Sequence, residues 1–154
     1  MNLTIDLDNA SQNTIPALKE VERWVTSAIG ESKESVELSI RVTNREEMSE
    51  LNKTYRNKDG ATNVLSFPAE LPAELELPLL GDLVICAPVV EDEAKQQGKT
   101  LQAHWAHIII HGTLHLLGYD HVDDTDAEIM ENLEIKLLAS LEFPNPYINH
   151  QEMI

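Results

Sequence analysis

Alternating apolar and polar residues predict strands at two places in the first third of the chain. Apolar side chains fill every second position in residues 3–7 and again in residues 36–42, which is the period of a half-buried strand. Residues 64–67 and 83–87 are mostly apolar and too short for a helix, so they predict two further strands. The pattern therefore predicts a sheet of about four strands.

Apolar residues at helical spacing separate and follow these strands. Five helices are predicted, over about residues 16–29, 44–56, 88–97, 101–117 and 124–141. Residues able to cap the N-termini of four of them are Asn13 or Thr14, Thr43 or Asn44, Thr100, and Asp123 or Asp124. The expected fold class is α+β, as a single domain over residues 1–154 with a small mixed, mostly parallel sheet covered by the helices. Residues 69–80 are expected to form a mobile loop, and residues 144–154 a flexible tail without a function.

The fourth predicted helix carries the most informative segment of the sequence. Its centre, residues 105–110, is apolar almost all round, so we expect this helix to lie in the middle of the fold. His111 and His115 follow, four residues apart and hence on one face of the helix. Gly118 can adopt the left-handed conformation that ends a helix, which would allow the chain to turn and bring His121 to the other two histidines.

Three histidines that converge in this way are typical of a zinc centre. Three imidazole ligands leave the fourth position of a tetrahedral zinc ion open to water, as in catalytic sites. His107 and His104 lie one and two turns earlier, respectively, on roughly the same face, and His107 forms a competing pair with His111 at the same spacing. We interpret His104 and His107 as residues behind the ligands or at the mouth of the cleft; the alternative is a solvated helix face.

The histidine spacing is also that of the metzincin proteases, which differ at one position. In those proteases a glutamate after the first histidine is the general base that activates the zinc-bound water. This chain has Gly112 there, and glycine has no side chain to act as a base. The zinc ligands therefore favour hydrolysis, whereas the missing carboxylate argues against the usual peptidase chemistry.

Cysteine content and hydropathy indicate a cytoplasmic protein. Cys86, the only cysteine, lies in an apolar segment and is expected to pack as a small core residue. The first residues lack the basic and apolar regions of a signal peptide. No apolar segment approaches the roughly 20 residues that span a bilayer, so no membrane association is expected.

The charge distribution is uneven. The formal net charge of −16 argues against a broad nucleic-acid-binding surface. However, five of the eleven Lys and Arg residues fall within residues 41–58, whereas residues 120–142 hold eight carboxylates and one lysine. This asymmetry would allow a local positive cleft on an acidic body; the alternative is that both regions are merely solvated faces.

Three segments, in this order along the chain, resemble the YbeY family of bacterial endoribonucleases, also called rRNA maturation factors. The residues that carry the likeness are Tyr55-Arg56-x-Lys58-Asp59-x-x-Thr62-Asn63-Val64-Leu65-Ser66-Phe67-Pro68, Leu80-Gly81-Asp82-Leu83 and His111-Gly112-x-Leu114-His115-Leu116-x-Gly118-Tyr119-Asp120-His121. The likeness extends over most of the chain. The family often has aspartate where this chain has Asn63.

The resemblance implies a zinc ion held by His111, His115 and His121, and a functional arginine at Arg56. It also implies a single-strand-specific endoribonuclease that matures the 3′ end of 16S rRNA and takes part in ribosome quality control. The expected partners are single-stranded RNA, the small ribosomal subunit and its proteins, whereas DNA is not expected.

A zinc site without a glutamate base suits a phosphodiester, whose charged oxygens can bind the metal directly. On this hypothesis His111 and Arg56 are catalytic, and Arg56 balances the negative charge of the transition state. Arg45, Lys58 and Asn63 are candidate substrate contacts. His107 and Asp120 are candidates for orienting the ligands or the water, and the alternative for Asp120 is that it satisfies the backbone of the turn.

Two other classes of function use the same residues. A zinc metalloprotease-like hydrolase would share the three histidines, and a non-catalytic ribosome-assembly factor would use the metal structurally. Three histidines also suit nickel, copper or iron, so the ligand set favours zinc without excluding another divalent transition metal.

Overall fold

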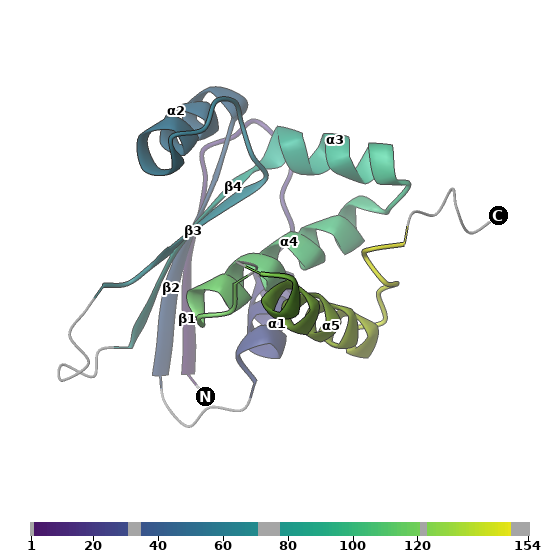
Figure 1. Cartoon of the computed structure of the whole chain (residues 1–154). Helices are drawn as coiled ribbons and strands as arrows, with labels where there is room; N and C mark the ends of the chain where they lie inside the picture. The colour runs from purple at the N-terminus through teal and green to yellow at the C-terminus, as the bar shows by residue number, and fades with distance from the viewer. Residues whose placement is uncertain (1, 31–34, 71–77, 121–122, 149–154) are drawn as a thin grey trace.

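The computed structural model describes residues 2–30, 35–70, 78–120 and 123–148 (Figure 1). Its elements, in chain order, are β1 (Asn2–Asn9), α1 (Leu18–Ile29), β2 (Ser35–Thr43), α2 (Arg45–Arg56), β3 (Val64–Pro68), β4 (Leu79–Cys86), α3 (Ala87–Gln97), α4 (Leu101–Leu116) and α5 (Asp124–Ser140). The four strands and five helices of the described residues confirm the predicted α+β class. No helix among these residues combines the length and the apolar character needed to cross a membrane.

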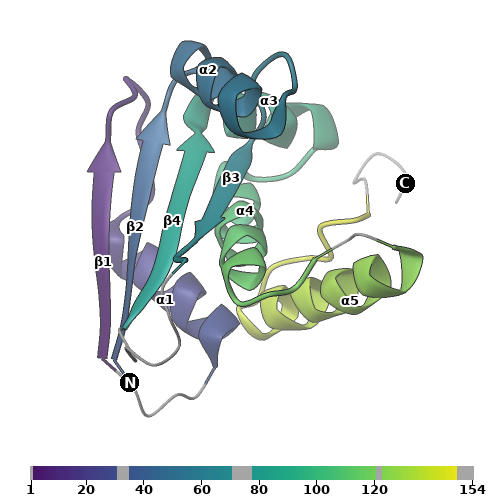
Figure 2. The same ribbon diagram turned by 60° about the vertical axis from the view of Figure 1, so that its left-hand side comes forward.

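The four strands form one mixed sheet in the order β1-β2-β4-β3, as Figure 2 shows. The pairs β1/β2 and β2/β4 are parallel, whereas β3 runs antiparallel to β4. The prediction of a mostly parallel sheet is therefore confirmed. Because β3 is the edge strand beside α4 (Figure 2), residues 64–68 lie next to the helix that carries the histidines.

Helices cover the two faces of the sheet unequally. The larger core lies between one face and the helices α1 and α4, with α5 packed against α4 (Figure 2). A smaller cluster on the other face lies under α2 and contains Met48, Leu65, Val84 and Cys86. Cys86 is buried and free of disulfides, in agreement with its predicted core position.

Helix α4 occupies the centre of the fold, as its apolar sequence predicted. All residues from Ala103 to Ile110 are buried. The Thr100 side chain caps the helix by accepting a hydrogen bond from the backbone N–H of Ala103 at 3.1 Å. Gly118 follows the last turn with a φ of 105°, a left-handed conformation that glycine adopts without steric cost. A buried helix of this kind holds its side chains in fixed positions.

Two boundaries differ from the sequence-based expectation. Helix α1 begins at Leu18 after Ala17, so neither Asn13 nor Thr14 caps it, and the Asn13 side chain instead donates to Glu91. Strand β4 begins at Leu79 rather than residue 83, because pairing with β2 extends its ladder beyond the apolar segment. The caps at Asn44, Thr100 and Asp123 are confirmed. Residues 71–77 of the expected loop lie outside the described residues.

Candidate functional site

A pocket of about 630 Å³ lies where α2, β3 and the C-terminal end of α4 meet. It is lined by Tyr55 and Arg56, residues 62–68, His111 and His115, and residues 118–120. Two of the three segments that carry the family likeness line this pocket, and the third, residues 80–83, pairs with β3, which also lines it. The fold therefore brings together parts of the chain that are separated by about fifty residues in the sequence.

His111 and His115 are neighbours in the pocket, as their spacing on one helix predicted. Their ring centroids lie 4.7 Å apart with an interplanar angle of 79°. Both side chains are partly buried, so they are held by the protein but remain open to the pocket. The third predicted ligand, His121, lies outside the described residues, so the three-histidine site stays a prediction.

Arg56 reaches the same pocket from the last position of α2. The helix ends at Asn57, which has a left-handed conformation with a φ of 52°. The end of α2 is held against the sheet by an edge-to-face contact between Tyr55 and Phe67, with ring centroids 5.1 Å apart. Arg56 itself is exposed, so its guanidinium is available to a ligand in the pocket.

The surroundings of Gly112 explain why this chain has no glutamate at the position of the metzincin base. A Cβ atom at this position would lie 2.9 Å from Leu83 Cδ2 and 3.2 Å from Val64 Cγ2. The Ser66 hydroxyl also donates to the Gly112 carbonyl at 3.1 Å. Because α4 lies this close to β3 and β4, the position next to His111 faces the core, and a glutamate side chain there would not fit.

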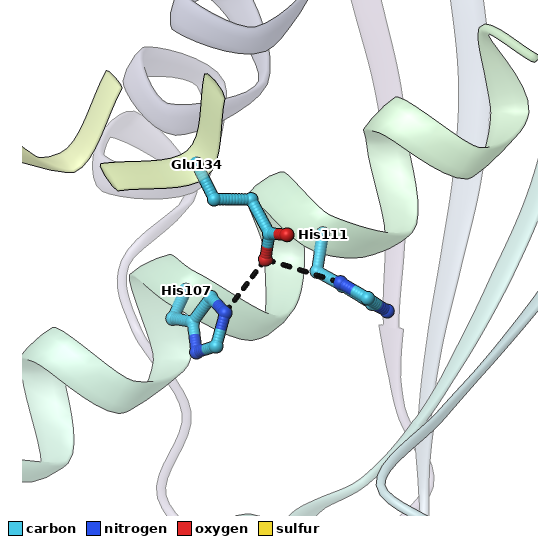
Figure 3. Close-up of side chains that lie close together, drawn as sticks. All are labelled: His107, His111 and Glu134. Atoms are coloured by element: carbon cyan, nitrogen blue, oxygen red, sulfur yellow. Dashed lines mark hydrogen bonds and ion pairs between the residues drawn. The ribbon is translucent and has the colours of Figure 1, made fainter. Parts of the chain in front are cut away.

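Glu134 of α5 is the residue that sequence reasoning missed. Its side chain is fully buried, and its Oε1 accepts hydrogen bonds from His107 Nε2 at 2.7 Å and from His111 Nδ1 at 3.1 Å (Figure 3). Its Oε2 accepts a hydrogen bond from the Tyr147 hydroxyl at 2.9 Å. A signal was present in the sequence, since Glu134 is four residues from both Met130 and Leu138 and therefore shares their core-facing stripe.

The charges in this group follow from burial and hydrogen bonding. Burial alone would raise the pKa of Glu134, but the hydrogen bonds from His107 and His111 outweigh it and lower the pKa to about 2. The carboxyl group is therefore ionised at neutral pH and can only accept hydrogen bonds. Burial lowers the pKa of His107 despite the opposing effect of Glu134. Burial, together with the Glu134 charge, raises the pKa of Tyr147.

His107, His111 and Glu134 could hold a metal ion, since their nearest ligand atoms all lie within 4.8 Å of one another. As placed, however, they are hydrogen-bonded to one another. When two ligand atoms each lie about 2.0–2.1 Å from one tetrahedral zinc ion, they are roughly 3.3 Å from each other. His107 Nε2 and Glu134 Oε1 are only 2.7 Å apart, which is a hydrogen-bond distance. The second ring nitrogen of His111, Nε2, lies on the far side of the ring from Glu134 (Figure 3).

The donor set in the pocket suits a zinc ion. Imidazole is a preferred zinc ligand, and metal-binding histidines commonly donate their other N–H to a carboxylate. His111 has that arrangement, since its Nδ1 is bonded to Glu134 and its Nε2 is the nitrogen with which it would bind a metal.

Only some of the other predicted residues lie at the pocket. Asp120 is exposed and lines it. Arg45 forms an ion pair with Asp92 at the start of α2, and Lys58 follows the end of that helix. Neither cation is among the described residues that line the pocket.

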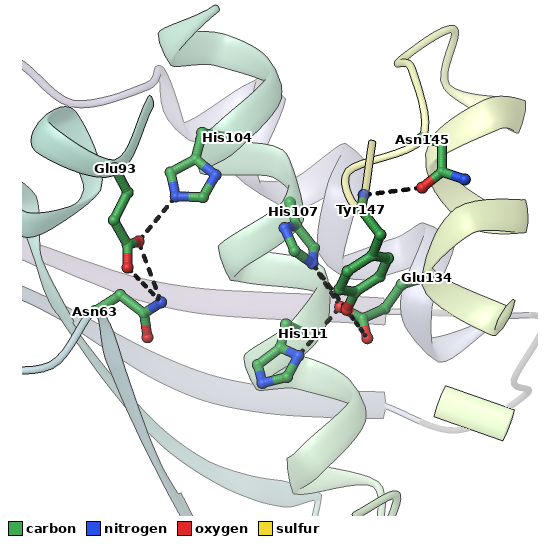
Figure 4. A network of polar contacts seen from close by, with 8 residues as sticks. All are labelled: Asn63, Glu93, His104, His107, His111, Glu134, Asn145 and Tyr147. Atoms are coloured by element: carbon green, nitrogen blue, oxygen red, sulfur yellow. Dashed lines mark hydrogen bonds and ion pairs between the residues drawn. The ribbon is translucent and has the colours of Figure 1, made fainter. Parts of the chain in front are cut away.

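Asn63 lines the pocket and also belongs to a second polar cluster. Its Nδ2 donates to Glu93 at 3.2 Å, and Glu93 also accepts from His104 Nε2 at 2.9 Å (Figure 4). Burial would raise the pKa of Glu93, but the hydrogen bonds from His104 and Asn63 bring it below its ordinary value. The amide nitrogen at this position is therefore engaged with Glu93.

The sequence and the fold are similar to those of known proteins. A family model described as Endoribonuclease YbeY matches residues 6–142. A protein of Stutzerimonas stutzeri (strain A1501) named Endoribonuclease YbeY is 58% identical over 146 residues, which cover 94% of this chain and 91% of that protein. The fold resembles the solution structure of TM1509 from Thermotoga maritima, with a TM-score of 0.57 and 24% identity over 95% of this chain and 99% of that one. Because the family model and this relative each span most of the sequence, the chain belongs to the YbeY family.

Proposed function

We propose that the chain is a zinc-dependent endoribonuclease that cleaves single-stranded RNA. The observation that carries this proposal is that Arg56, His111 and His115 line one pocket, so that one cavity holds a guanidinium group and two imidazoles. The name of the Stutzerimonas relative, Endoribonuclease YbeY, supports RNA as the substrate. The proposed setting is the cytoplasm, in maturation of the 3′ end of 16S rRNA and in ribosome quality control.

His111, His115 and His121 would hold the zinc ion, with His111 binding through Nε2. When bound, zinc supplies a Lewis acid and a water molecule whose pKa is lowered towards neutrality. The protein itself contributes the orientation of the ligands and the exclusion of a carboxylate base at Gly112.

Arg56 would act on the scissile phosphate. A guanidinium group presents parallel N–H donors that match two phosphate oxygens. Negative charge on these oxygens increases as the nucleophile attacks, so the interaction with Arg56 becomes stronger in the transition state than in the ground state. The exposure of Arg56 leaves its donors available for this contact.

Arg45, Lys58 and Asn63 would contact parts of the RNA outside the reacting phosphate, and Asp120 would orient the water or a ligand at the pocket mouth. With a formal net charge of −16, the protein as a whole repels the polyanionic RNA. Basic proteins of the small ribosomal subunit would therefore help to dock it on the rRNA.

The test measures zinc content and cleavage of single-stranded RNA on the same preparations of wild type, His115→Ala and Arg56→Ala. We expect His115→Ala to lose zinc and cleavage, and Arg56→Ala to keep zinc but lose about 100-fold or more in cleavage rate. Arg23→Ala, which removes an exposed arginine of α1, is the matched control and should cleave like wild type.

Circular dichroism and thermal melting establish that all variants are folded. Equal weak cleavage by every variant would identify a contaminating nuclease and would contradict the proposal. If zinc were bound in that case, the metal would be structural, as in an assembly factor. Digestion of a peptide library, with no cleavage of RNA, would favour the metalloprotease alternative.

A further inference from the structure

A chain of hydrogen bonds links the C-terminal segment of the described residues to the candidate metal ligand. The Tyr147 hydroxyl donates to Glu134 Oε2 at 2.9 Å, and His111 Nδ1 donates to Glu134 Oε1 at 3.1 Å (Figure 4). His107 Nε2 donates to the same Oε1 at 2.7 Å. The carboxylate is thus bonded from three sides by residues of α4 and of the segment that follows α5.

These contacts determine which nitrogen of His111 carries the proton. A carboxylate has no hydrogen to donate, so His111 must donate through Nδ1–H. A neutral imidazole has only one N–H, which leaves the lone pair on Nε2. Figure 3 shows this nitrogen on the side of the ring away from Glu134. The hydrogen bond therefore selects the tautomer that can bind a metal in the pocket.

Glu134 needs all of its partners because it has no contact with solvent. Its exposed fraction is 0%, and a buried carboxylate without partners is strongly destabilising. Among the three donors, Tyr147 alone lies outside the two packed helices. It contacts His107 as well, with ring centroids 5.3 Å apart at 81°. Residue 147 falls within the segment for which the sequence suggested a flexible tail without a function.

We infer that Glu134 and Tyr147 are positioning residues, which hold the His111 imidazole in the orientation and tautomer required for metal binding. Glu134 acts directly on His111, and Tyr147 acts through Glu134 by fixing the carboxylate plane. This inference rests on the proposed function to the extent that His111 is a zinc ligand. It makes the segment after α5 a part of the site.

The test compares zinc dissociation constants, measured by competition with a chelator of known affinity. Glu134→Gln removes the charge at nearly constant shape, and we expect it to weaken zinc binding by about 10–100-fold. Tyr147→Phe removes only the hydroxyl group. It should weaken zinc binding by about two- to tenfold, since Tyr147 is one hydrogen bond further from His111 than Glu134 is. Glu128→Gln changes an exposed glutamate of the same helix and serves as the control with wild-type affinity.

A second readout does not need the metal. In the zinc-free wild type, nitrogen-15 NMR of the imidazoles should show His111 protonated at Nδ1, and this preference should weaken in Glu134→Gln. Melting temperatures of the zinc-free variants separate a loss of folding from a loss of positioning, and Tyr147→Phe remains informative if Glu134→Gln does not fold.

Unchanged zinc affinity in folded Glu134→Gln and Tyr147→Phe, next to tight binding by wild type, would overturn the inference while leaving the proposed function intact. A wild type that binds no zinc would contradict both. Protonation of His111 at Nε2 in the zinc-free protein would overturn the inference by itself.

Discussion

The two walls of the pocket are built in different ways. We call His111, His115 and the strand β3 the buried wall, because α4 and α5 hold it from behind through Gly112 and Glu134. We call Tyr55 and Arg56 the exposed wall, because both side chains lie in solvent at the end of α2. The buried wall has fixed side-chain positions, whereas the exposed wall is held mainly by the contact between Tyr55 and Phe67.

The difference matches what each wall is proposed to do. A metal site depends on ligands that are oriented before the metal arrives, and a buried carboxylate behind a histidine provides that orientation. A cation that binds the phosphates of a flexible strand must reach its ligand, and exposure leaves it able to do so. The pocket therefore combines one rigid and one accessible wall, and the two should respond differently to mutation.

The largest effect on stability is expected at Gly81 of β4, which pairs with β3 of the buried wall. This residue has a φ of 149°, and an added Cβ would lie 2.4 Å from the Phe67 carbonyl oxygen and 2.9 Å from Leu116 Cδ2. Gly81→Ala should therefore push β3 and α4 apart and lower the free energy of unfolding by about 3 kcal/mol, measured by urea denaturation.

Gly60→Ala is the matched control for Gly81→Ala. Gly60 also has a positive φ, of 88°, but no atom lies within 4 Å of an added Cβ. Gly60→Ala should therefore lower the free energy of unfolding only by the backbone strain, about 1 kcal/mol. Equal losses for the two variants would show that the contact with Phe67 contributes nothing.

A substitution in the exposed wall should instead lower the cleavage activity without changing the free energy of unfolding. Arg56→Lys keeps the charge but loses the paired donors of the guanidinium, so we expect RNA cleavage to fall by about 10–100-fold. The unfolding free energy should change by no more than about 0.5 kcal/mol, because the side chain is exposed. Single-turnover cleavage and urea denaturation measure the two effects. Full activity in Arg56→Lys would mean that the charge alone suffices.

The smallest expected effect concerns the ion pair that ties the start of α2 to the sheet. Arg41 of β2 donates to Glu47 through Nε at 2.6 Å and through Nη2 at 2.9 Å. The hydrogen bond from Arg41 is the main cause that lowers the pKa of Glu47 below its ordinary value. A lowered pKa means that the pair stabilises the fold above the unfolded-state pKa, and that this contribution is lost as the pH falls through the folded-state pKa.

Glu47→Gln should therefore reduce stability by about 0.5 kcal/mol at neutral pH, a small value because the pair is partly exposed to solvent. The difference from wild type should vanish as denaturation curves are recorded further into the acid range. Glu46→Gln removes a neighbouring exposed charge from the same helical turn. It is the control for the loss of a negative charge at the N-terminus of the helix, where the helix dipole favours such a charge. A difference between wild type and Glu47→Gln that persists in acid would exclude the ion pair as its source.

Local patterns in the sequence determined much of this molecule. The four strands, the five helices and three of the helix caps follow from period, length and capping chemistry, because these depend on residues within about four positions of one another. The same local rules placed His111 and His115 on one face of α4 and a left-handed glycine at Gly118. The family resemblance was carried by short segments, and the comparisons confirmed it.

The tertiary structure alone decided which residues lie behind the candidate metal ligands His111 and His115. Glu134 is 23 residues from His111 in the sequence, and Tyr147 comes from the segment after the last helix, so no local pattern pairs them. The early start of β4 depends on its pairing with β2, and the need for glycine at position 112 depends on its contacts with Leu83 and Val64. Local periodicity specifies which face of an element is buried, whereas the partner that meets that face is chosen only when the whole chain packs.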